Sequence, residues 1–338
     1  MKSHHPAGAR VEAVKIVAIV AVVQFLIGGW FSWTASRSEP RDIPVAIAAE
    51  PARAKELTTL LERTGPGAAF ELKTASSAAD ADAMLKDREA YGAFVAAGDG
   101  KGWELHLASA ASPAVASALT GRLAELTGTS ALVKEVVPAS DADPHGTGIT
   151  MGFLPLVVTS VIAGLLFVLK VPVPRLRLPG VVAFAVLSGA LSSLMLTVIS
   201  GVLPGSYLTN AAVIALLELG MTGFIAGLGS LVGPGGIAGG AVVMFLIGNP
   251  LSGIASAPEL LPGPLGTVGQ LLPPGAAGSL IRSAGAFDGA GILRPAAVLV
   301  VWAAIGLTLL ALAARRPAPG APSEATAPTA RPAEATAA

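Results

Sequence analysis

The sequence predicts an α-helical polytopic membrane protein with six transmembrane helices and a small extracytoplasmic α/β domain between the first two. Hydrophobic residues make up 53% of the 338 residues and charged residues only 13%, whereas a soluble domain carries roughly 25% charged residues. Six stretches reach the ~20 apolar residues that cross a hydrocarbon core about 30 Å thick. Residues 36–148, between the first two stretches, have the mixed charge of a soluble surface.

The six expected spans contain no charged residue apart from Glu218 in the fourth. They are Ile16–Trp33, Ile149–Leu169, Val181–Leu203, Ala211–Val232, Ile237–Ala257 and Pro295–Ala314. The expected division of the chain is therefore an N-terminal segment (1–13), the first helix (14–35), the α/β domain (36–148), the membrane domain (149–316) and a tail (317–338). We expect the tail to be disordered, because Ala, Pro, Thr and Glu leave it little to bury.

Lysine and arginine in the short connecting segments predict the orientation, because these residues resist translocation. Alternation across six spans collects them on one side: Lys2, Arg10, Lys15, Lys170, Arg175, Arg177, Arg315 and Arg316. Both termini are therefore expected in the cytoplasm of a multi-pass protein of the cell membrane. A cleaved signal peptide is the alternative for the first span, but its apolar run exceeds the about 7–15 residues of such peptides.

The segment between the first two spans alternates strand and helix patterns. Strands are expected at Ile43–Ala49, Phe70–Ala75, Tyr91–Ala97 and Trp103–Ser109, and helices at Ala52–Arg63, Ala79–Glu89 and Pro113–Leu126. This order predicts a small α/β domain. Because Pro40–Pro138 carries its own apolar residues, we expect it to fold independently.

Composition argues against several function classes. Lys plus Arg and Asp plus Glu both number 22, so there is no net positive charge for nucleic acid, and no cysteine is present for a thiol nucleophile. Asp141, Asp143 and His145 form a weak candidate for a cation, but a solvated linker explains them better. We find no catalytic constellation, no metal site and no cofactor motif, and expect a protein that is not an enzyme.

Glu218 is the ionisable residue within a predicted span, and such residues usually face the bundle interior or water. Helical spacing predicts that Thr222 lies on the same stripe, with Gly220, Gly223 and Gly227 on nearly the opposite face as a close-packing surface. Two interpretations stay open: Glu218 and Thr222 line a pathway, or Glu218 is a hydrogen-bonded structural residue.

Two connecting segments are further candidates. Lys170–Gly180 is short, basic and rich in proline, so it either contacts a cytoplasmic partner or only sets the topology. Leu260–Gly291 is apolar but interrupted by Pro and Gly. We expect a re-entrant or interfacial helix at Ala276–Phe287 within the outer segment 258–294, with Arg282 and Asp288 near the headgroups. An apolar loop packed on the α/β domain is the alternative.

The layout resembles the type-2 ABC exporter permeases, in particular the phage-infection-protein-like membrane proteins. The resemblance is carried by "IPVAIAAE" from Ile43, by "AYGAFVAA" at Ala90–Ala97 and by the segment Leu272–Gly289 before the last span, and it covers Val14–Arg316. Shorter segments at the N-terminus and at 170–180 depart from the family pattern.

The resemblance implies a permease that exports hydrophobic or amphipathic compounds as a homodimer or a paired half-transporter. It also implies that Arg175 and Arg177 contact the partner ATPase and that Arg282 lies in an outer re-entrant element. No P-loop motif is present, so ATP would be hydrolysed by a separate cytoplasmic subunit. The alternative is a non-transporting envelope receptor or secretion-accessory protein.

Overall fold

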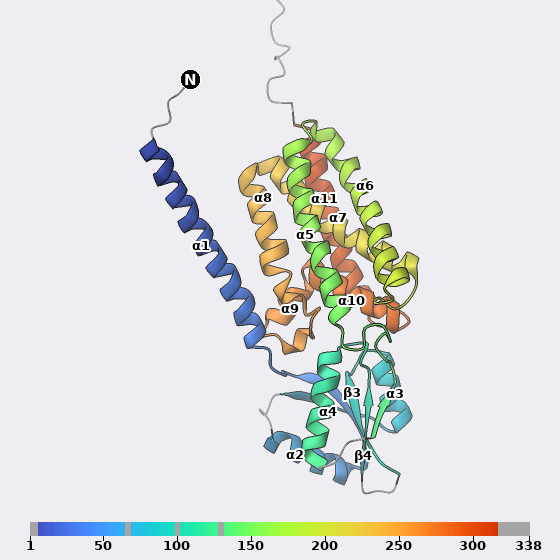
Figure 1. Ribbon diagram of the computed structural model, residues 1–338. Helices are drawn as coiled ribbons and strands as arrows, with labels where there is room; N and C mark the ends of the chain where they lie inside the picture. The colour runs from blue at the N-terminus through green and yellow to red at the C-terminus, as the bar shows by residue number, and fades with distance from the viewer. Residues whose placement is uncertain (1–5, 65–68, 99–101, 128–131, 317–338) are drawn as a thin grey trace, which may run out of the picture.

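The computed structural model describes residues 6–64, 69–98, 102–127 and 132–316. An α/β domain sits at one end of a helix bundle, and the first helix, α1 (Pro6–Ser36), stands apart from both (Figure 1). The segment 6–13, which we expected to precede the first span, is therefore the start of this helix. The tail 317–338, expected to be disordered, lies outside the described residues.

The α/β domain has the predicted order of strands and helices, with one strand added. Its elements are β1 (Ile43–Ala48), α2 (Pro51–Thr64), β2 (Phe70–Thr74), α3 (Ala78–Lys86), β3 (Gly92–Ala96), β4 (Trp103–Leu107), α4 (Pro113–Thr127) and β5 (Leu132–Glu135). Strand β5 is absent from the sequence-based prediction. All four of its residues are exposed, so it lacks the buried positions that make a strand recognisable.

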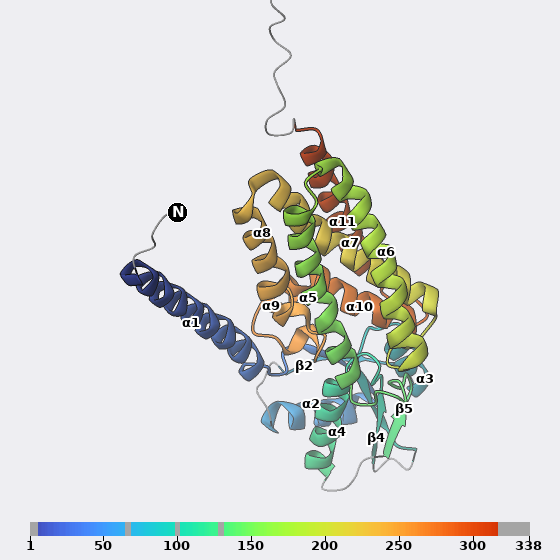
Figure 2. The same ribbon diagram turned by 45° about the horizontal axis from the view of Figure 1, so that its top comes forward.

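The sheet has the strand order β2-β1-β3-β4-β5. Strand β1 pairs in parallel with β2 and β3, β3 pairs antiparallel with β4, and β4 pairs in parallel with β5. Helices α2 and α4 cover one face and α3 covers the other (Figure 2). The turn from β3 to β4 includes residues 99–101, which are outside the described part of the chain.

Both faces of this sheet are completed by residues from the second half of the chain. Ala257 and Leu260 belong to the core beneath α2 and α4, and Phe287 belongs to the core beneath α3. The linker before β1 is also held there, because the backbone amide of Glu39 donates to the carbonyl of Leu260 at 3.0 Å. The expectation that Pro40–Pro138 is self-contained therefore needs correction: its cores extend beyond this range.

Five of the described helices are long and apolar enough to cross a membrane, which is compatible with a multi-pass membrane protein. Besides α1 they are α5 (Thr147–Lys170), α6 (Pro174–Ser193, continued by a π-helical segment to Ile199), α7 (Tyr207–Val232) and α11 (Leu293–Ala314). Helix α7 is the most buried of the five and contacts α5, α6 and α11.

The fifth expected span, Ile237–Ala257, is a shorter helix in the structure. It consists of α8 (Pro234–Ala241) and a π-helical continuation, Val242–Ile247. Fourteen residues span about 21 Å, which is less than the hydrocarbon thickness. The helix nevertheless leads from the far end of the bundle toward α9 and the α/β domain (Figure 1), so α11 returns the chain to the far end. The helix ends where Gly248, Asn249 and Pro250 follow, because Pro250 starts a short 3₁₀ turn that redirects the chain.

Two short helices lie between the bundle and the α/β domain (Figure 1): α9 (Leu265–Gln270) and α10 (Pro273–Ala286). A 3₁₀ turn, Pro258–Leu260, precedes α9. This region corresponds to the expected re-entrant segment. Helix α10 instead has ten buried residues and contacts α7 and α11, so it forms the floor on which the α/β domain rests.

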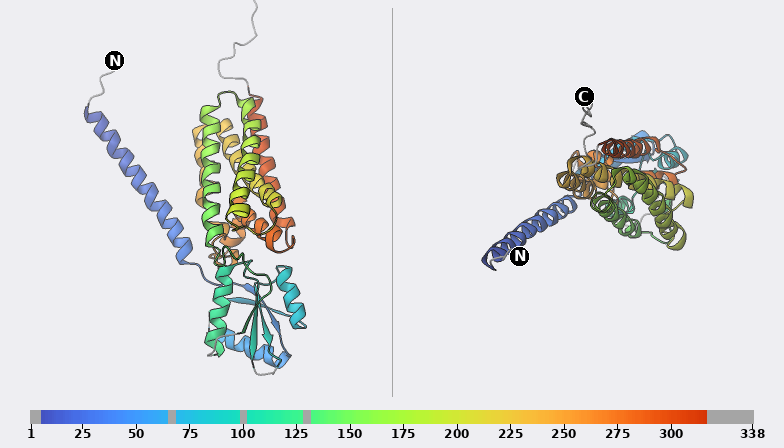
Figure 3. Two further views of the ribbon diagram at one scale, coloured as in Figure 1. Left: turned by 45° about the vertical axis from the view of Figure 1, so that its right-hand side comes forward. Right: turned by 90° about the horizontal axis from the view of Figure 1, so that it is seen from above.

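Helix α1 leaves the rest of the molecule at an angle (Figure 3). Its apolar window is entirely unburied. Contact is limited to its last turns, where the indole nitrogen of Trp30 donates to the carbonyl of Leu246 at 2.8 Å and Phe31 lies 5.9 Å from Phe245 between ring centroids.

The predicted glycine stripe on α7 is confirmed as a close-packing face. A Cβ added to Gly223 would meet the backbone of Gly306 on α11 at 3.4 Å, and one added to Gly227 would meet the side chain of Leu309 at 2.5 Å. Gly220 faces Trp302 of the same helix. Helices α7 and α11 approach closely because no side chain separates them.

Candidate functional site

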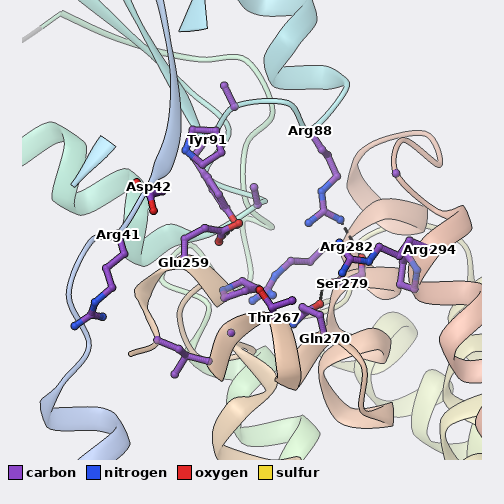
Figure 4. Close-up of a pocket in the computed structure, with 18 of the residues that line it drawn as sticks. Arg41, Asp42, Arg88, Tyr91, Glu259, Thr267, Gln270, Ser279, Arg282 and Arg294 are labelled. Carbon is purple, nitrogen blue, oxygen red and sulfur yellow. Dashed lines mark hydrogen bonds between the residues drawn. The ribbon is translucent and has the colours of Figure 1, made fainter. Parts of the chain in front are cut away.

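A cavity of about 600 Å³ lies where the α/β domain meets the floor formed by α9 and α10 (Figure 4). The domain contributes the linker before β1 and the turn after α3. The bundle side contributes the segment from Pro258 to Gln270, part of α10 and the start of α11. Charged and polar side chains line it: Arg41, Asp42, Asp87, Arg88, Tyr91, Glu259, Thr267, Gln270, Ser279, Arg282 and Arg294.

Arg88 reaches from the α/β domain to α10. Its backbone adopts a left-handed conformation (φ 60°) just after α3, which is uncommon for a residue with a side chain. The guanidinium donates to the carbonyl of Ser279 at 2.9 Å and to the hydroxyl of Ser283 at 2.5 Å, and it lies 5.2 Å above the ring of Phe287. Arg88 thus ties the two parts together beside the cavity.

Arg282 lies on α10 beneath the domain and is only 7% exposed. One of its nitrogens, Nη2, donates to the carbonyl of Ile254 at 2.7 Å. Among the described residues no carboxylate forms an ion pair with Arg282 or with Arg88. Burial lowers the pKa of Arg282 to about 10, and the nearby charge of Arg88 contributes. Arg282 therefore remains charged at neutral pH.

Tyr91 and Glu259 meet across the same cavity. The Tyr91 hydroxyl donates to Oε2 of Glu259 at 2.8 Å. Burial raises the pKa of Tyr91 well above its usual range, and the Glu259 carboxylate raises it further. The phenol consequently keeps its proton and acts as the donor in this pair.

The floor of the cavity is an ordered set of uncharged donors and acceptors. The Ser279 hydroxyl donates to Oε1 of Gln270 at 2.6 Å, and Nε2 of Gln270 donates to the carbonyl of Ser252 at 3.0 Å. Gln270 is held at both ends of its amide, so α9 and α10 keep a defined spacing.

The two residues expected in the outer re-entrant element have different environments. Arg282, expected near lipid headgroups, is a buried residue of α10 that donates to the carbonyl of Ile254 and lines the cavity. Asp288 is exposed and has a left-handed backbone (φ 49°) directly after α10. The apolar face of α10 packs on protein, because the α/β domain and the bundle enclose it, whereas the position of this helix relative to a membrane stays a prediction.

Glu218 and Thr222 are fully buried on α7. The Ser160 hydroxyl donates to Oε2 of Glu218 at 2.6 Å, and the Ser188 hydroxyl donates to Oε1 at 3.2 Å. Thr222 donates to the carbonyl of Ser160 at 3.3 Å. Glu218 therefore joins α5, α6 and α7, and it does not line the cavity described above. This geometry favours the structural interpretation over the pathway.

Arg175 and Arg177 are part of α6, because α5 ends at Lys170 and α6 begins at Pro174. The expected loop Lys170–Gly180 is thus reduced to three residues. Arg177 donates from Nε to the carbonyl of Val171 at 3.0 Å and from Nη1 to the Ser230 hydroxyl at 2.8 Å. Arg177 is occupied within the bundle, whereas Arg175 is exposed.

The acidic linker before α5 caps the N-terminus of that helix. Asp143 accepts from the backbone amides of Gly148 at 2.9 Å and Ile149 at 2.8 Å, which stabilises the positive end of the helix. Within the described ranges no group of three potential metal ligands is found. The cation interpretation of Asp141, Asp143 and His145 therefore gains no support.

No family model, no curated protein and no solved structure matches this chain. The site must therefore be interpreted from its own geometry. Sequence reasoning singled out Arg282 but missed Arg88, Tyr91 and Glu259. Arg88 and Glu259 are ordinary surface residues by sequence, and Tyr91 appeared only as part of a strand. Their common position depends on how the domain docks.

Proposed function

We propose that the chain is the membrane subunit of an ABC-type exporter for hydrophobic or amphipathic compounds, located in the cell membrane with both termini in the cytoplasm. The observation that carries this proposal is the cavity lined jointly by the α/β domain and the bundle. A receptor would bind its ligand on the free surface of the α/β domain. A permease would bind its substrate where the helix bundle opens to the outside. The cavity lies at the end of the bundle beside the α/β domain, which supports the permease.

Energy for export would come from a separate ATPase, since the chain has no P-loop motif. The far end of the bundle, opposite the α/β domain, is the surface that such a partner would contact. Arg177 and Arg316 donate to backbone carbonyls there. Arg175 and Arg315 are exposed, and we assign the partner contact to these two.

A second copy of the chain, or a paired permease, would extend the membrane part. The position of α1 supports this arrangement, since the apolar window of this helix is unburied and only its last turns contact its own chain, which leaves the helix available to a neighbouring bundle. Lipid would cover the same surface in a monomer. Cross-linking of the protein in native membranes would distinguish a pair of chains from a monomer.

A non-transporting envelope receptor or secretion-accessory protein is the second candidate. It is favoured by the packing around Glu218, where both carboxylate oxygens accept hydrogen bonds from α5 and α6. A polar residue satisfied in this way stabilises a bundle that does not open.

The experiment is purification of the full chain after gentle extraction, with measurement of the accompanying ATPase activity in vesicles. We expect Arg175→Ala to reduce that activity without changing expression, because an exposed cation at the contact is lost while Lys170 and the N-terminal cations maintain the orientation. Lys55→Ala, an exposed cation on the α/β domain, is the matched control. Recovery of no ATPase with the wild type would favour the receptor.

A further inference from the structure

We infer that the cavity between the α/β domain and α10 binds an oxyanion, the phosphate of an amphiphile headgroup, between Arg88, Arg282 and Arg294. As a description of the exported compound the inference rests on the proposed function, whereas the binding itself can be tested separately.

Charge balance within the cavity supports an anionic ligand. Four arginines line it, against the three carboxylates of Asp42, Asp87 and Glu259. Asp42 and Asp87 are exposed at the rim, and Glu259 already accepts the hydrogen bond from Tyr91. The Glu259 carboxylate also acts on Arg88, so this one carboxylate faces the two guanidinium groups of Arg88 and Arg282, and one positive charge is left in excess.

The burial of Arg282 is the strongest single argument. Arg282 as a whole residue is only 7% exposed, so its charged group loses much of its hydration, and this cost is normally offset by a carboxylate or another anion. The described bond from Arg282 is one from Nη2 to the Ile254 carbonyl. The planar guanidinium has further N–H donors in a fork that matches a phosphate. A bound phosphate would supply the missing counter-charge.

Arg294 completes the arrangement from the side of the bundle. It lies in the first turn of α11, lines the cavity, and has no described hydrogen bond or ion pair. Its position at the start of a membrane-length helix corresponds to the level of lipid headgroups. The cavity is thus reached at the depth where the phosphate of an amphiphile lies.

Apolar side chains beside the cavity suit the rest of such a molecule. Val268 is 42% exposed, Leu271 is 51% exposed and Leu293 is 83% exposed. Each directly follows or precedes a residue that lines the cavity, namely Thr267, Gln270 and Arg294. Exposed apolar side chains thus occur on α9, directly after it and at the start of α11, the same elements that contribute polar lining to the cavity.

The test is a binding titration of the purified full-length protein in a neutral detergent. The probes are short-chain phosphatidylglycerol, short-chain phosphatidylcholine, glycerol phosphate and inorganic phosphate. We expect phosphatidylglycerol to bind best, because it combines a net negative phosphate with acyl chains. Its affinity should decrease as salt is added, since the interaction is ionic.

Four variants separate the site from the rest of the molecule. Arg282→Gln should weaken binding by about tenfold or more, as expected for loss of a charged hydrogen bond. Arg282→Lys keeps the charge but loses the fork and should weaken binding less. Arg294→Gln removes an exposed cation and should weaken it about threefold. Lys55→Gln, an exposed cation on the α/β domain that does not line the cavity, is the matched control and should leave affinity unchanged.

The outcomes are distinguishable. Binding of phosphatidylglycerol alone supports a lipid headgroup, and equal binding of inorganic phosphate supports a free oxyanion at the same site. The inference is overturned if no probe binds the wild type, or if Arg294→Gln and Arg282→Lys, both folded by thermal unfolding, bind as the control does. The test remains decisive even if Arg282→Gln does not fold, because Arg294→Gln and Arg282→Lys probe the same site. Recovery of the ATPase partner is measured in a separate experiment. Failure of phosphate binding would therefore overturn this inference alone, and absence of an ATPase would count against the exporter alone.

Discussion

The guanidinium of Arg88 donates a hydrogen bond to the backbone carbonyl of Ser279 at 2.9 Å, although 191 positions separate the two residues. This contact connects the turn after α3 to α10 and closes one side of the cavity. The phenol of Tyr91 and the carboxylate of Glu259 make a second such connection at 2.8 Å. The α/β domain is therefore fastened to the bundle through the same residues that line the cavity, so binding there would change how the two parts are held.

The dependence of the α/β domain on the bundle gives the first prediction. Phe287→Ala in the full chain should lower the free energy of unfolding by about 3–5 kcal/mol, because Phe287 is 4% exposed within the core under α3. Leu132→Ala on β5 is the control, since Leu132 is 66% exposed and should change stability by under about 0.5 kcal/mol. Thermal unfolding measures both. Equal midpoints for the two variants would show that the domain does not need this contact.

The close approach of α7 and α11 gives the second prediction. An alanine at Gly306 would bring its Cβ within 2.7 Å of the backbone of Gly223 and Phe224, so Gly306→Ala should cost about 1–3 kcal/mol. Gly121→Ala on α4 is matched, because no atom lies within 4 Å of the added Cβ. It should stabilise by roughly 0.5–1 kcal/mol through its better helix propensity. Thermal midpoints in detergent that move in the same direction would contradict the packing argument.

The hydrogen bonds of Glu218 give the third prediction. Glu218→Ala should destabilise the bundle by about 1–3 kcal/mol, because Ser160 and Ser188 lose their acceptor. Glu218→Gln keeps an acceptor and should cost less. Thermal unfolding and stimulation of the partner ATPase are measured together. If Glu218→Gln abolished stimulation at an unchanged midpoint, Glu218 would belong to a pathway instead.

The acidic residue Asp82 predicts a pH dependence of the α/β domain. Its Oδ1 lies 2.5 Å from Nδ1 of His106, and its Oδ2 accepts from Lys134 at 2.7 Å. Burial opposes ionisation, but Lys134 and His106 together lower the pKa of Asp82 below its usual 3.8. Since the folded-state value is the lower one, the unfolded chain takes up the proton first as pH falls.

The contribution of Asp82 should therefore be complete above pH 3.8 and disappear as the pH falls through the folded-state pKa. Asp82→Ala should lower the thermal midpoint at about pH 6, and the difference from the wild type should shrink toward about pH 3. Lys55→Ala, on the same domain and exposed, serves as the control. A difference that stays constant with pH would assign the effect to packing alone.

The orientation of the chain gives the last prediction. The sequence has no native cysteine, so single cysteines report their own positions. Ser117→Cys on α4, which is exposed, should react with an impermeant thiol reagent in intact cells, because positive-inside counting assigns the α/β domain to the outside. Arg175→Cys at the far end should react only after permeabilisation. The opposite pattern would invert the proposed topology.

Local periodicity in the sequence was sufficient for most of the elements. Long apolar stretches identified the five membrane-length helices, and the spacing of apolar residues identified four strands and three helices of the α/β domain in order. These features are encoded between neighbours a few positions apart. β5 was missed because its residues are exposed. The length of the helix that ends at Ile247 was overestimated, because apolar residues continue past the turn at Pro250.

Tertiary structure decided the surroundings of the polar residues. The sequence marked Glu218 as unusual, but only the packing of α5 and α6 supplied Ser160 and Ser188 as its donors. It placed Arg282 in an apolar segment at the lipid interface, and docking of the α/β domain buried that residue beside a cavity. The physical reason is that hydrophobic pattern records which face is buried, whereas the partner that covers this face is chosen by contacts between segments far apart in the chain.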